Sequence, residues 1–180
     1  MFRKILIYGV IAGLIVGGVL FGVTVTMAGH PPSAYGVVLG YTTMLLALTA
    51  VFIGVKRYRD VALGGVVRFW PAFGMGLAIS FIASIFYVLA WEAALAVTQL
   101  DFAGVYSQAL IARQKAEGVS GEALTKFIAE MEQFKLQYAN PLFRIPMTFA
   151  EIFPVGLLVS LASAGLLRNS RFLAARDPRS

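Results

Sequence analysis

Four long apolar stretches divide this chain, and their lengths constrain its fold more than any other feature of the sequence. They cover residues 5–27, 35–55, 73–96 and 143–167. Each reaches the roughly 20 residues that a helix needs to cross about 30 Å of hydrocarbon. Transmembrane strands are shorter, about 10 residues, and alternate in polarity. The stretches therefore predict an all-α membrane protein built as a four-transmembrane-helix bundle, a single membrane domain over residues 1–180.

The composition agrees with a membrane protein. Of the 180 residues, 59% are hydrophobic and 13% are charged, whereas soluble domains carry about 25% charged residues. A cleaved signal peptide is the alternative interpretation of the first stretch, since Arg3 and Lys4 precede it. Its apolar part is longer than the about 7–15 residues of a signal-peptide core. We therefore expect the first stretch to remain as a membrane span.

The positive charges predict how the chain crosses the membrane. Lysines and arginines gather before the first span, between the second and third, and after the fourth: Arg3, Lys4, Lys56, Arg57, Arg59, Arg68, Arg168, Arg171, Arg176 and Arg179. Such residues favour the cytoplasmic side of a membrane. Both termini and the middle loop are therefore predicted to be cytoplasmic, and residues 99–142 to lie on the other side. Because topology accounts for the net charge of +6, the charge does not indicate a nucleic-acid partner.

Residues 101–139 have a pattern typical of two amphipathic helices. In the first half the apolar positions at helical spacing are Phe102, Val105, Tyr106, Ala109 and Leu110, and in the second half they are Leu124, Phe127, Ile128, Met131, Phe134 and Tyr138. This spacing places each set on one helix face. We expect an extracytoplasmic amphipathic helical hairpin between the third and fourth spans. Its apolar faces must be buried against each other, the bundle, the lipid interface or a partner.

Small residues predict close helix packing in the first two spans. Gly9, Gly13 and Gly17 repeat every four residues in the first span, and Gly36 and Gly40 have the same spacing in the second. Such faces let two helix backbones approach closely in a membrane. Two interpretations are open for the first span. Its glycine face packs within the chain against the second or fourth span, or it forms the seam of a homodimer.

Two carboxylates, Glu92 and Glu151, fall inside the predicted spans. An ionised, unpaired carboxylate in a membrane costs a few kcal/mol. At about 1.5 Å per residue they lie roughly 6 and 12 Å from the extracytoplasmic end of their spans, in the same half as Arg144. We predict a polar cluster of Glu92, Arg144 and Glu151. It either locks the third and fourth spans together or binds a proton or cation, next to a helix break at Pro154.

Groups for enzyme chemistry are scarce in this sequence. It contains no cysteine, and His30 is its single histidine, placed in a predicted loop. A serine–histidine or metal–histidine site would need groups that the chain lacks. No Walker or dinucleotide-binding glycine loop is present. We therefore expect no enzyme activity, no catalytic residues, no metal and no cofactor.

Two motifs resemble those of a known family. One is KRYRD at 56–60, and the other, more specific, is NPLFRIPMTFAEIFPVGL at 140–157, with Tyr87 and Trp91 between them. Over nearly the whole chain the sequence resembles the bacterial membrane family called domain-of-unknown-function family 4199 (DUF 4199). The resemblance implies a bacterial inner-membrane protein of four spans with a periplasmic helical insertion. It implies no catalytic or binding residues.

The sequence supports two functional hypotheses. The first is a non-enzymatic protein that acts by interaction, as an accessory subunit of an envelope complex. It rests on the glycine faces, the amphipathic hairpin and the scarcity of catalytic groups. The second is a small ion- or solute-transporting membrane protein that uses Glu92 and Glu151. The expected partners are the lipid bilayer and either further copies of the chain or another membrane protein.

Overall fold

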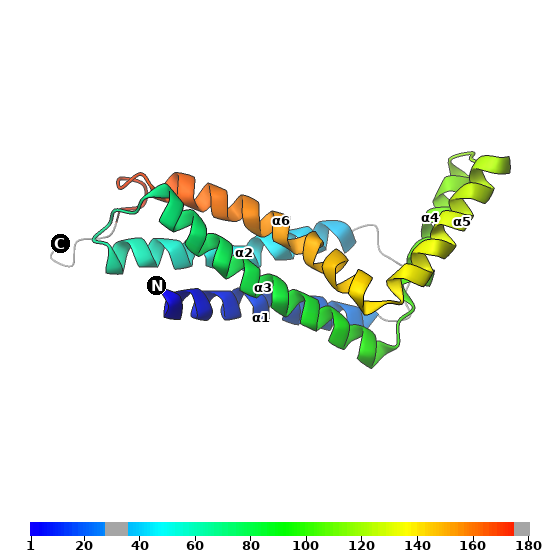
Figure 1. Ribbon diagram of the computed structural model, residues 1–180, viewed down its shortest axis with the longest axis horizontal. Coiled ribbons are helices and arrows are strands. Elements are labelled where there is room, and N and C mark those ends of the chain that lie inside the picture. Colours follow the sequence, from blue (N-terminus) through cyan, green and yellow to red (C-terminus); the bar gives the residue numbers. More distant parts are fainter. Residues whose placement is uncertain (28–35, 175–180) are drawn as a thin grey trace.

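The computed structural model describes residues 1–27 and 36–174, and this part of the chain is helical (Figure 1). Its elements are α1 (Phe2–Met27), α2 (Gly36–Ala62), α3 (Phe69–Thr98), α4 (Phe102–Ala116), α5 (Gly121–Tyr138) and α6 (Pro141–Leu167). The predicted loop that contains His30 lies outside the described residues. Helix α6 continues without a break through Pro146 and Pro154, although the sequence predicted an interruption there.

The four long helices α1, α2, α3 and α6 run along the long axis of the molecule, and α4 and α5 project from one end (Figure 1). Within the bundle α3 lies between α1 and α6, and α2 contacts all three. The N-terminus lies at the end opposite the α4–α5 pair (Figure 1). The connection between α2 and α3 and residues 168–174 lie at that same end, so the bundle has an N-terminal end and an α4–α5 end.

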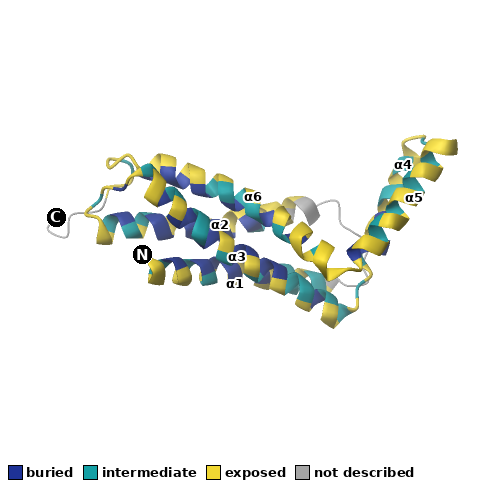
Figure 2. Cartoon of the chain, viewed as in Figure 1, coloured by how far each residue is buried: buried dark blue, intermediate teal, exposed yellow. Residues whose placement is uncertain are grey.

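Among the described residues, α1, α3 and α6 are long and apolar enough to cross a membrane. Large apolar side chains on their outer faces are exposed, for example Leu14 at 60%, Phe81 at 49% and Leu158 at 65% (Figure 2). A contiguous apolar surface of this kind is unfavourable in water and is typical of a lipid-facing surface. The prediction of an all-α membrane protein is therefore confirmed. The second predicted span, 35–55, corresponds to α2 from residue 36 onward, and the start of α2 adjoins undescribed residues.

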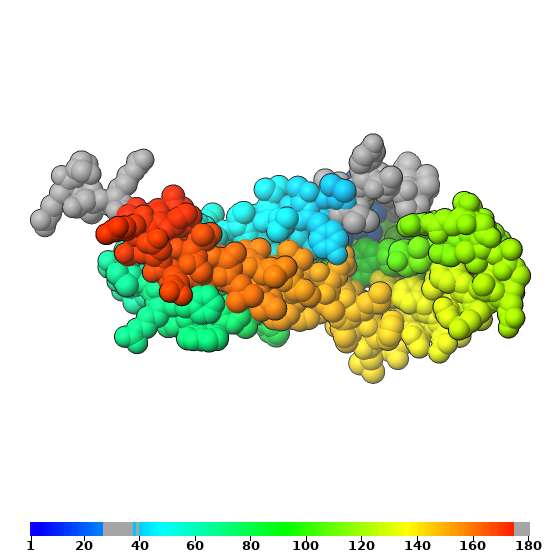
Figure 3. Space-filling model, turned by 90° about the horizontal axis from the view of Figure 1, so that it is seen from above, coloured from blue at the N-terminus to red at the C-terminus, as the bar shows by residue number. Residues whose placement is uncertain are grey.

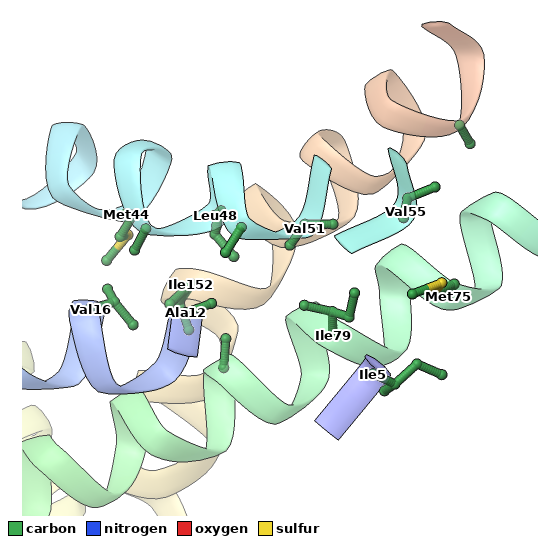
Figure 4. Packing of buried hydrophobic residues seen from close by; sticks show 14 of the residues in the cluster. Ile5, Ala12, Val16, Met44, Leu48, Val51, Val55, Met75, Ile79 and Ile152 are labelled. Carbon is green, nitrogen blue, oxygen red and sulfur yellow. The ribbon is translucent and has the colours of Figure 1, made fainter. Parts of the chain in front are cut away.

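The core lies where the four long helices meet (Figure 4). Its buried side chains are mostly of medium size, and they include Ala12, Val16, Met44, Leu48, Val51, Ile79 and Ile152. Side chains of this size interdigitate in their preferred rotamers and allow the helices to pack closely. The packing fixes α3 and α6 relative to each other, which matters because these two helices carry the predicted polar cluster.

A seam of serines and glycines brings α3 and α6 close together. A Cβ atom added to Gly156 would lie 2.7 Å from Cβ of Ser80, and one added to Gly76 would lie 3.0 Å from Cβ of Ser160. The Ser80 hydroxyl donates a hydrogen bond of 3.1 Å to the carbonyl of Gly156, across the two helices. Hydrogen bonds between membrane helices stabilise their association by about 0.6 kcal/mol on average. This seam was not among the features predicted from the sequence.

The glycine face of α1 lies against α3. The expectation that it packs against the second or fourth span was therefore wrong. A Cβ atom added to Gly9 would lie 2.7 Å from Cβ of Ile82, and one added to Gly13 would lie 2.6 Å from Cβ of Phe86. Residues of α3 at four-residue spacing thus fill the face. Because the partner is a helix of the same chain, this face is not available as a homodimer seam.

The glycines of α2 differ from those of α1. A Cβ atom added to Gly40 would meet no atom within 4 Å, so Gly40 adjoins open space and not a neighbouring helix. Gly36 is the first residue of α2, and its packing lies outside the described contacts. The two glycines therefore do not reproduce the close approach seen along α1.

We expect Gly13→Ala to destabilise the protein and Gly18→Ala to leave it unchanged or slightly more stable. The methyl group at position 13 would clash with Cβ of Phe86, an atom that cannot move without shifting α3. Overpacking of this kind costs about 1–3 kcal/mol. A Cβ atom added at position 18 would meet no atom within 4 Å, and alanine favours a helix by up to about 1 kcal/mol over glycine. Thermal unfolding in one detergent measures both, and equal midpoints would contradict the packing of α1 on α3.

At the N-terminal end of the bundle a buried arginine holds the segment after α6. The side chain of Arg59 is fully buried and lies 2.6 Å from the Asp60 carboxylate. It donates hydrogen bonds of 2.9 Å to the carbonyl of Phe172 and 2.8 Å to that of Leu173. Burial alone would raise the pKa of Asp60, but hydrogen bonds from Arg59 and Lys56 lower it below its usual value. Asp60 is therefore a charged partner, and Arg59 is a structural residue as well as a topological charge.

At the opposite end α4 and α5 lie side by side as an antiparallel pair (Figures 1 and 3). Asp101 caps α4 as its position suggests, since its carboxylate accepts a hydrogen bond of 2.9 Å from the backbone N–H of Gly104. Ser120 precedes α5 but makes no capping hydrogen bond through its side chain. The apolar face of α5 points inward, with Tyr138 buried. In α4, however, the small residues at 103, 104 and 107 are buried, whereas Val105 and Tyr106 are exposed.

Candidate functional site

An ion pair between α3 and α6 forms the base on which the α4–α5 pair sits. The guanidinium of Arg144 donates from Nε to Oε1 of Glu92 at 2.7 Å and from Nη2 to Oε2 at 2.5 Å. Such a two-bond pair fixes the orientation of both side chains. The exposed fractions are 16% for Arg144 and 26% for Glu92, so water screens the pair only partly. The structure thus brings together two of the three residues of the predicted cluster.

Arg144 also ties the end of α5 to the bundle. Its Nη1 donates a hydrogen bond of 3.2 Å to the backbone carbonyl of Tyr138, and its guanidinium lies 5.7 Å from the centroid of the Tyr138 ring. A guanidinium over an aromatic face is an attractive cation–π arrangement. One arginine therefore contacts α3 through Glu92 and α5 through Tyr138.

Tyr138 is the buried residue that joins the α4–α5 pair to α3. Its hydroxyl accepts a hydrogen bond of 2.8 Å from Nε1 of Trp91, and only 6% of the residue is exposed. Burial raises the pKa of Tyr138 to about 12, because an apolar environment disfavours the phenolate. The hydroxyl is therefore neutral at any physiological pH, and this contact between α3 and α5 persists.

Aromatic rings fill the space around this junction. Phe102 of α4 lies 5.1 Å from Trp91 and 5.5 Å from Tyr138 between ring centroids, and Phe134 lies 5.5 Å from Tyr138 and 6.1 Å from Tyr106. Aromatic pairs at such distances contribute about 0.5–1.5 kcal/mol each beyond their buried area. We name Trp91, Phe102, Tyr106, Phe134 and Tyr138 the aromatic junction. It holds the α4–α5 pair in one orientation on the bundle.

Glu151 is not part of the Glu92–Arg144 ion pair, which corrects the predicted three-residue cluster. Arg144 and Glu151 are seven residues apart on α6, almost two helical turns, about 10 Å along the helix axis, and Arg144 is directed to Glu92 and Tyr138. Glu151 instead lies on the wall of a cavity that Tyr87 also lines. Tyr87 is 4% exposed and lies inside the bundle.

Glu151 and Tyr87 line a cavity of about 530 Å³ between the bundle and the α4–α5 pair. The wall combines all five residues of the aromatic junction with apolar groups and a few polar ones, namely Leu20, Gly40, Met147, Thr148 and Ala150. Its volume lies within the about 300–1,000 Å³ of typical ligand sites. A second, more polar cavity of about 410 Å³ lies beside the ion pair and is lined by Glu92, Asp101, Lys135 and Arg144, among others.

The described ranges 1–27 and 36–174 contain no cluster of side chains suited to holding a metal ion. No three His, Asp or Glu side chains in these ranges lie close enough to hold a metal ion. The two intramembrane carboxylates occupy separate positions, one in an ion pair and one beside a tyrosine. The site is therefore best described as a rigid junction with an adjoining cavity that has a single carboxylate.

The fold and the site together define an all-helical membrane protein that carries a helix pair at one end of its bundle. The sequence matches the family described as "Protein of unknown function (DUF4199)" over residues 7–169. The chain belongs to this family, which confirms the resemblance of its motifs. No curated protein matches the sequence, and no solved structure matches the chain.

Proposed function

We propose that this chain is a multi-pass protein of the bacterial inner membrane that acts by interaction, as an accessory subunit of an envelope complex. The observation that carries the proposal is the attachment of the α4–α5 pair. The aromatic junction and the Arg144–Glu92 pair hold it in a fixed orientation. A rigid platform reduces the entropy that a binding surface loses when it meets a partner.

The proposed topology places this platform in the periplasm. Counting α2 as a span gives four crossings, with both termini in the cytoplasm and residues 99–142 on the periplasmic side. The basic residues at 56, 57, 59, 168 and 171 support this orientation, since they lie at the N-terminal end of the bundle (Figure 1) and basic residues favour the cytoplasmic side. The α4–α5 pair presents exposed apolar residues there, including Leu136 at 77% and Val105 at 40%.

Native mass spectrometry of the chain, extracted mildly from its own membrane, tests the proposal. We expect a second protein at a fixed ratio to the chain. Leu136→Lys should release that protein without lowering the thermal stability, because an exposed side chain contributes little to folding. Glu130→Gln, also exposed on α5, is the control and should retain it. A chain that is found free of other proteins in every mild extraction would contradict the proposal.

The cavity at Glu151 favours a second candidate, a small ion- or solute-transporting protein. Glu92 is engaged by Arg144, so the cation-binding role of this hypothesis falls to Glu151. Flux of protons or cations into liposomes that contain the purified chain would support transport, and Glu151→Gln should abolish it. Liposomes with the wild-type chain that show no flux above empty liposomes would exclude this candidate.

A further inference from the structure

The starting observation is a carboxylate without a cationic partner. Among the described residues no lysine or arginine forms an ion pair with Glu151, and the basic residue nearest to it on α6, Arg144, is bound to Glu92. Glu151 lines the same cavity as Tyr87, and a tyrosine hydroxyl carries no charge. An ionised carboxylate in a membrane helix is stable only with a counter-charge or polar partners. The cavity beside Glu151 is the place where a cation can approach it.

The cavity wall has the composition of a site for an organic cation. Six aromatic residues line it: Tyr87, Trp91, Phe102, Tyr106, Phe134 and Tyr138. Aromatic faces attract ammonium groups, and groups of such rings are the usual receptors for alkylated ammonium. Inorganic cations fit less well, because Ca²⁺ and Mg²⁺ need about six oxygen ligands. Glu151, Tyr87 and Thr148 supply few oxygen atoms at this wall.

We propose that this cavity binds an ammonium group carried on an apolar chain. The ammonium lies against the Glu151 carboxylate and the surrounding rings, and the chain extends along the apolar side of the cavity formed by Leu20, Met147 and Ala150. A membrane offers this chemistry in two forms, as the ethanolamine headgroup of a phospholipid and as a free alkylammonium. The inference does not depend on the proposed role as an accessory subunit, because it concerns a different surface of the chain.

Gly40 offers a way to close the cavity without disturbing the fold. It lines the cavity, and an added Cβ atom would meet no other atom within 4 Å. Gly40→Leu therefore projects a side chain into open space and should fold normally. Gly18 has the same open surroundings on α1 and does not line this cavity, so Gly18→Leu is the matched control.

The free-amphiphile arm uses the full chain in nanodiscs of phosphatidylglycerol, a lipid without an ammonium group. The probe is dodecyltrimethylammonium, and dodecanol is the uncharged probe of equal chain length. Fluorescence of Trp91, in a Trp70→Phe background, reports binding at the cavity wall, because Trp91 is one of its lining residues. We expect a saturable signal with the cationic probe and none with dodecanol. Glu151→Gln and Gly40→Leu should each weaken binding at least tenfold, and Gly18→Leu should not.

The lipid arm uses native mass spectrometry of the same variants released from nanodiscs that mix phosphatidylethanolamine with phosphatidylglycerol. One retained phosphatidylethanolamine per chain, lost in Glu151→Gln, identifies the lipid as the source of the ammonium. Binding of dodecyltrimethylammonium without lipid retention identifies a free amphiphile, and binding of both shows that the site accepts either. The proposal is wrong if the wild type binds neither ligand saturably, or if Glu151→Gln binds both as the wild type does.

Discussion

Replacing Arg59 with methionine is expected to cause the largest loss of stability of any single change considered for this chain. The guanidinium is fully buried and contacts the Asp60 carboxylate together with two carbonyls of the segment after α6. Methionine fills similar volume but leaves the two carbonyls and Oδ1 of Asp60 without these donors, while Oδ2 of Asp60 keeps its hydrogen bond from Lys56. Removing one partner of a buried ion pair costs about 3–5 kcal/mol. We expect a loss of about 3 kcal/mol, measured by unfolding in a mixed detergent, with earlier proteolysis of residues 168–174.

Two further substitutions separate this contact from a general effect of charge. Arg57→Met removes the same charge two positions away, where the side chain is exposed, and should be nearly neutral. Arg59→Lys keeps the charge but has no planar fork that reaches Asp60 and the two carbonyls together, so its loss should be intermediate. If Arg57→Met and Arg59→Met destabilise equally, the charge itself matters and the buried contacts do not.

Separating Glu92 from Arg144 is expected to loosen the α4–α5 pair. Arg144→Gln leaves Glu92 without its partner and removes the contacts to Tyr138, whereas Glu92→Gln removes only the acid. We therefore expect Arg144→Gln to be the more destabilising. A double-mutant cycle with both changes should give a coupling free energy of about 1–2 kcal/mol. This coupling is weaker than that of a fully buried pair, because 16% of the Arg144 side chain and 26% of the Glu92 side chain are exposed and water screens exposed charges.

A second ion pair of the chain supplies the comparison for that cycle. Arg113 in the last turn of α4 and Glu117 just after the helix are four residues apart, with Nε and Oε1 at 2.8 Å, but their side chains are 73% and 48% exposed. The same cycle there should show no measurable coupling, since exposed pairs are screened by water and salt. Hydrogen exchange of α5 reports the predicted loosening directly. Equal coupling at both pairs would mean that the contact between Glu92 and Arg144 is as weak as a surface pair.

The N-terminal end of the bundle has a structural role, whereas both functional proposals concern the α4–α5 end. At the N-terminal end the Arg59 side chain donates hydrogen bonds to backbone carbonyls of the segment after α6. Arg59 therefore stabilises the fold in addition to setting the membrane orientation. At the α4–α5 end an aromatic junction, an ion pair and a cavity lie together. The accessory-subunit proposal uses the outer surface of the α4–α5 pair, and the ammonium proposal uses the cavity between this pair and the bundle. Each can therefore be tested without the other.

The helical membrane class could be predicted from sequence because it depends on local properties. A stretch of about 20 apolar residues must satisfy its backbone hydrogen bonds within itself, whichever neighbours it has. The same reasoning applies to the period of apolar residues in α5, whose inward face ends at the buried Tyr138. In α4 the predicted apolar face was wrong in part, because Val105 and Tyr106 are exposed. The small residues at 103, 104 and 107 are buried instead, since they allow a closer approach to neighbouring helices.

The sequence by itself determined which segments are helical and apolar, and which polar residues lie within them. Only the tertiary structure decided the partner of each group. It places the glycine face of α1 against α3, pairs Arg144 with Glu92, and leaves Glu151 beside Tyr87 at a cavity. The physical reason is that periodicity fixes the face of a helix on which a residue lies, whereas side-chain volumes across the whole bundle decide which faces meet.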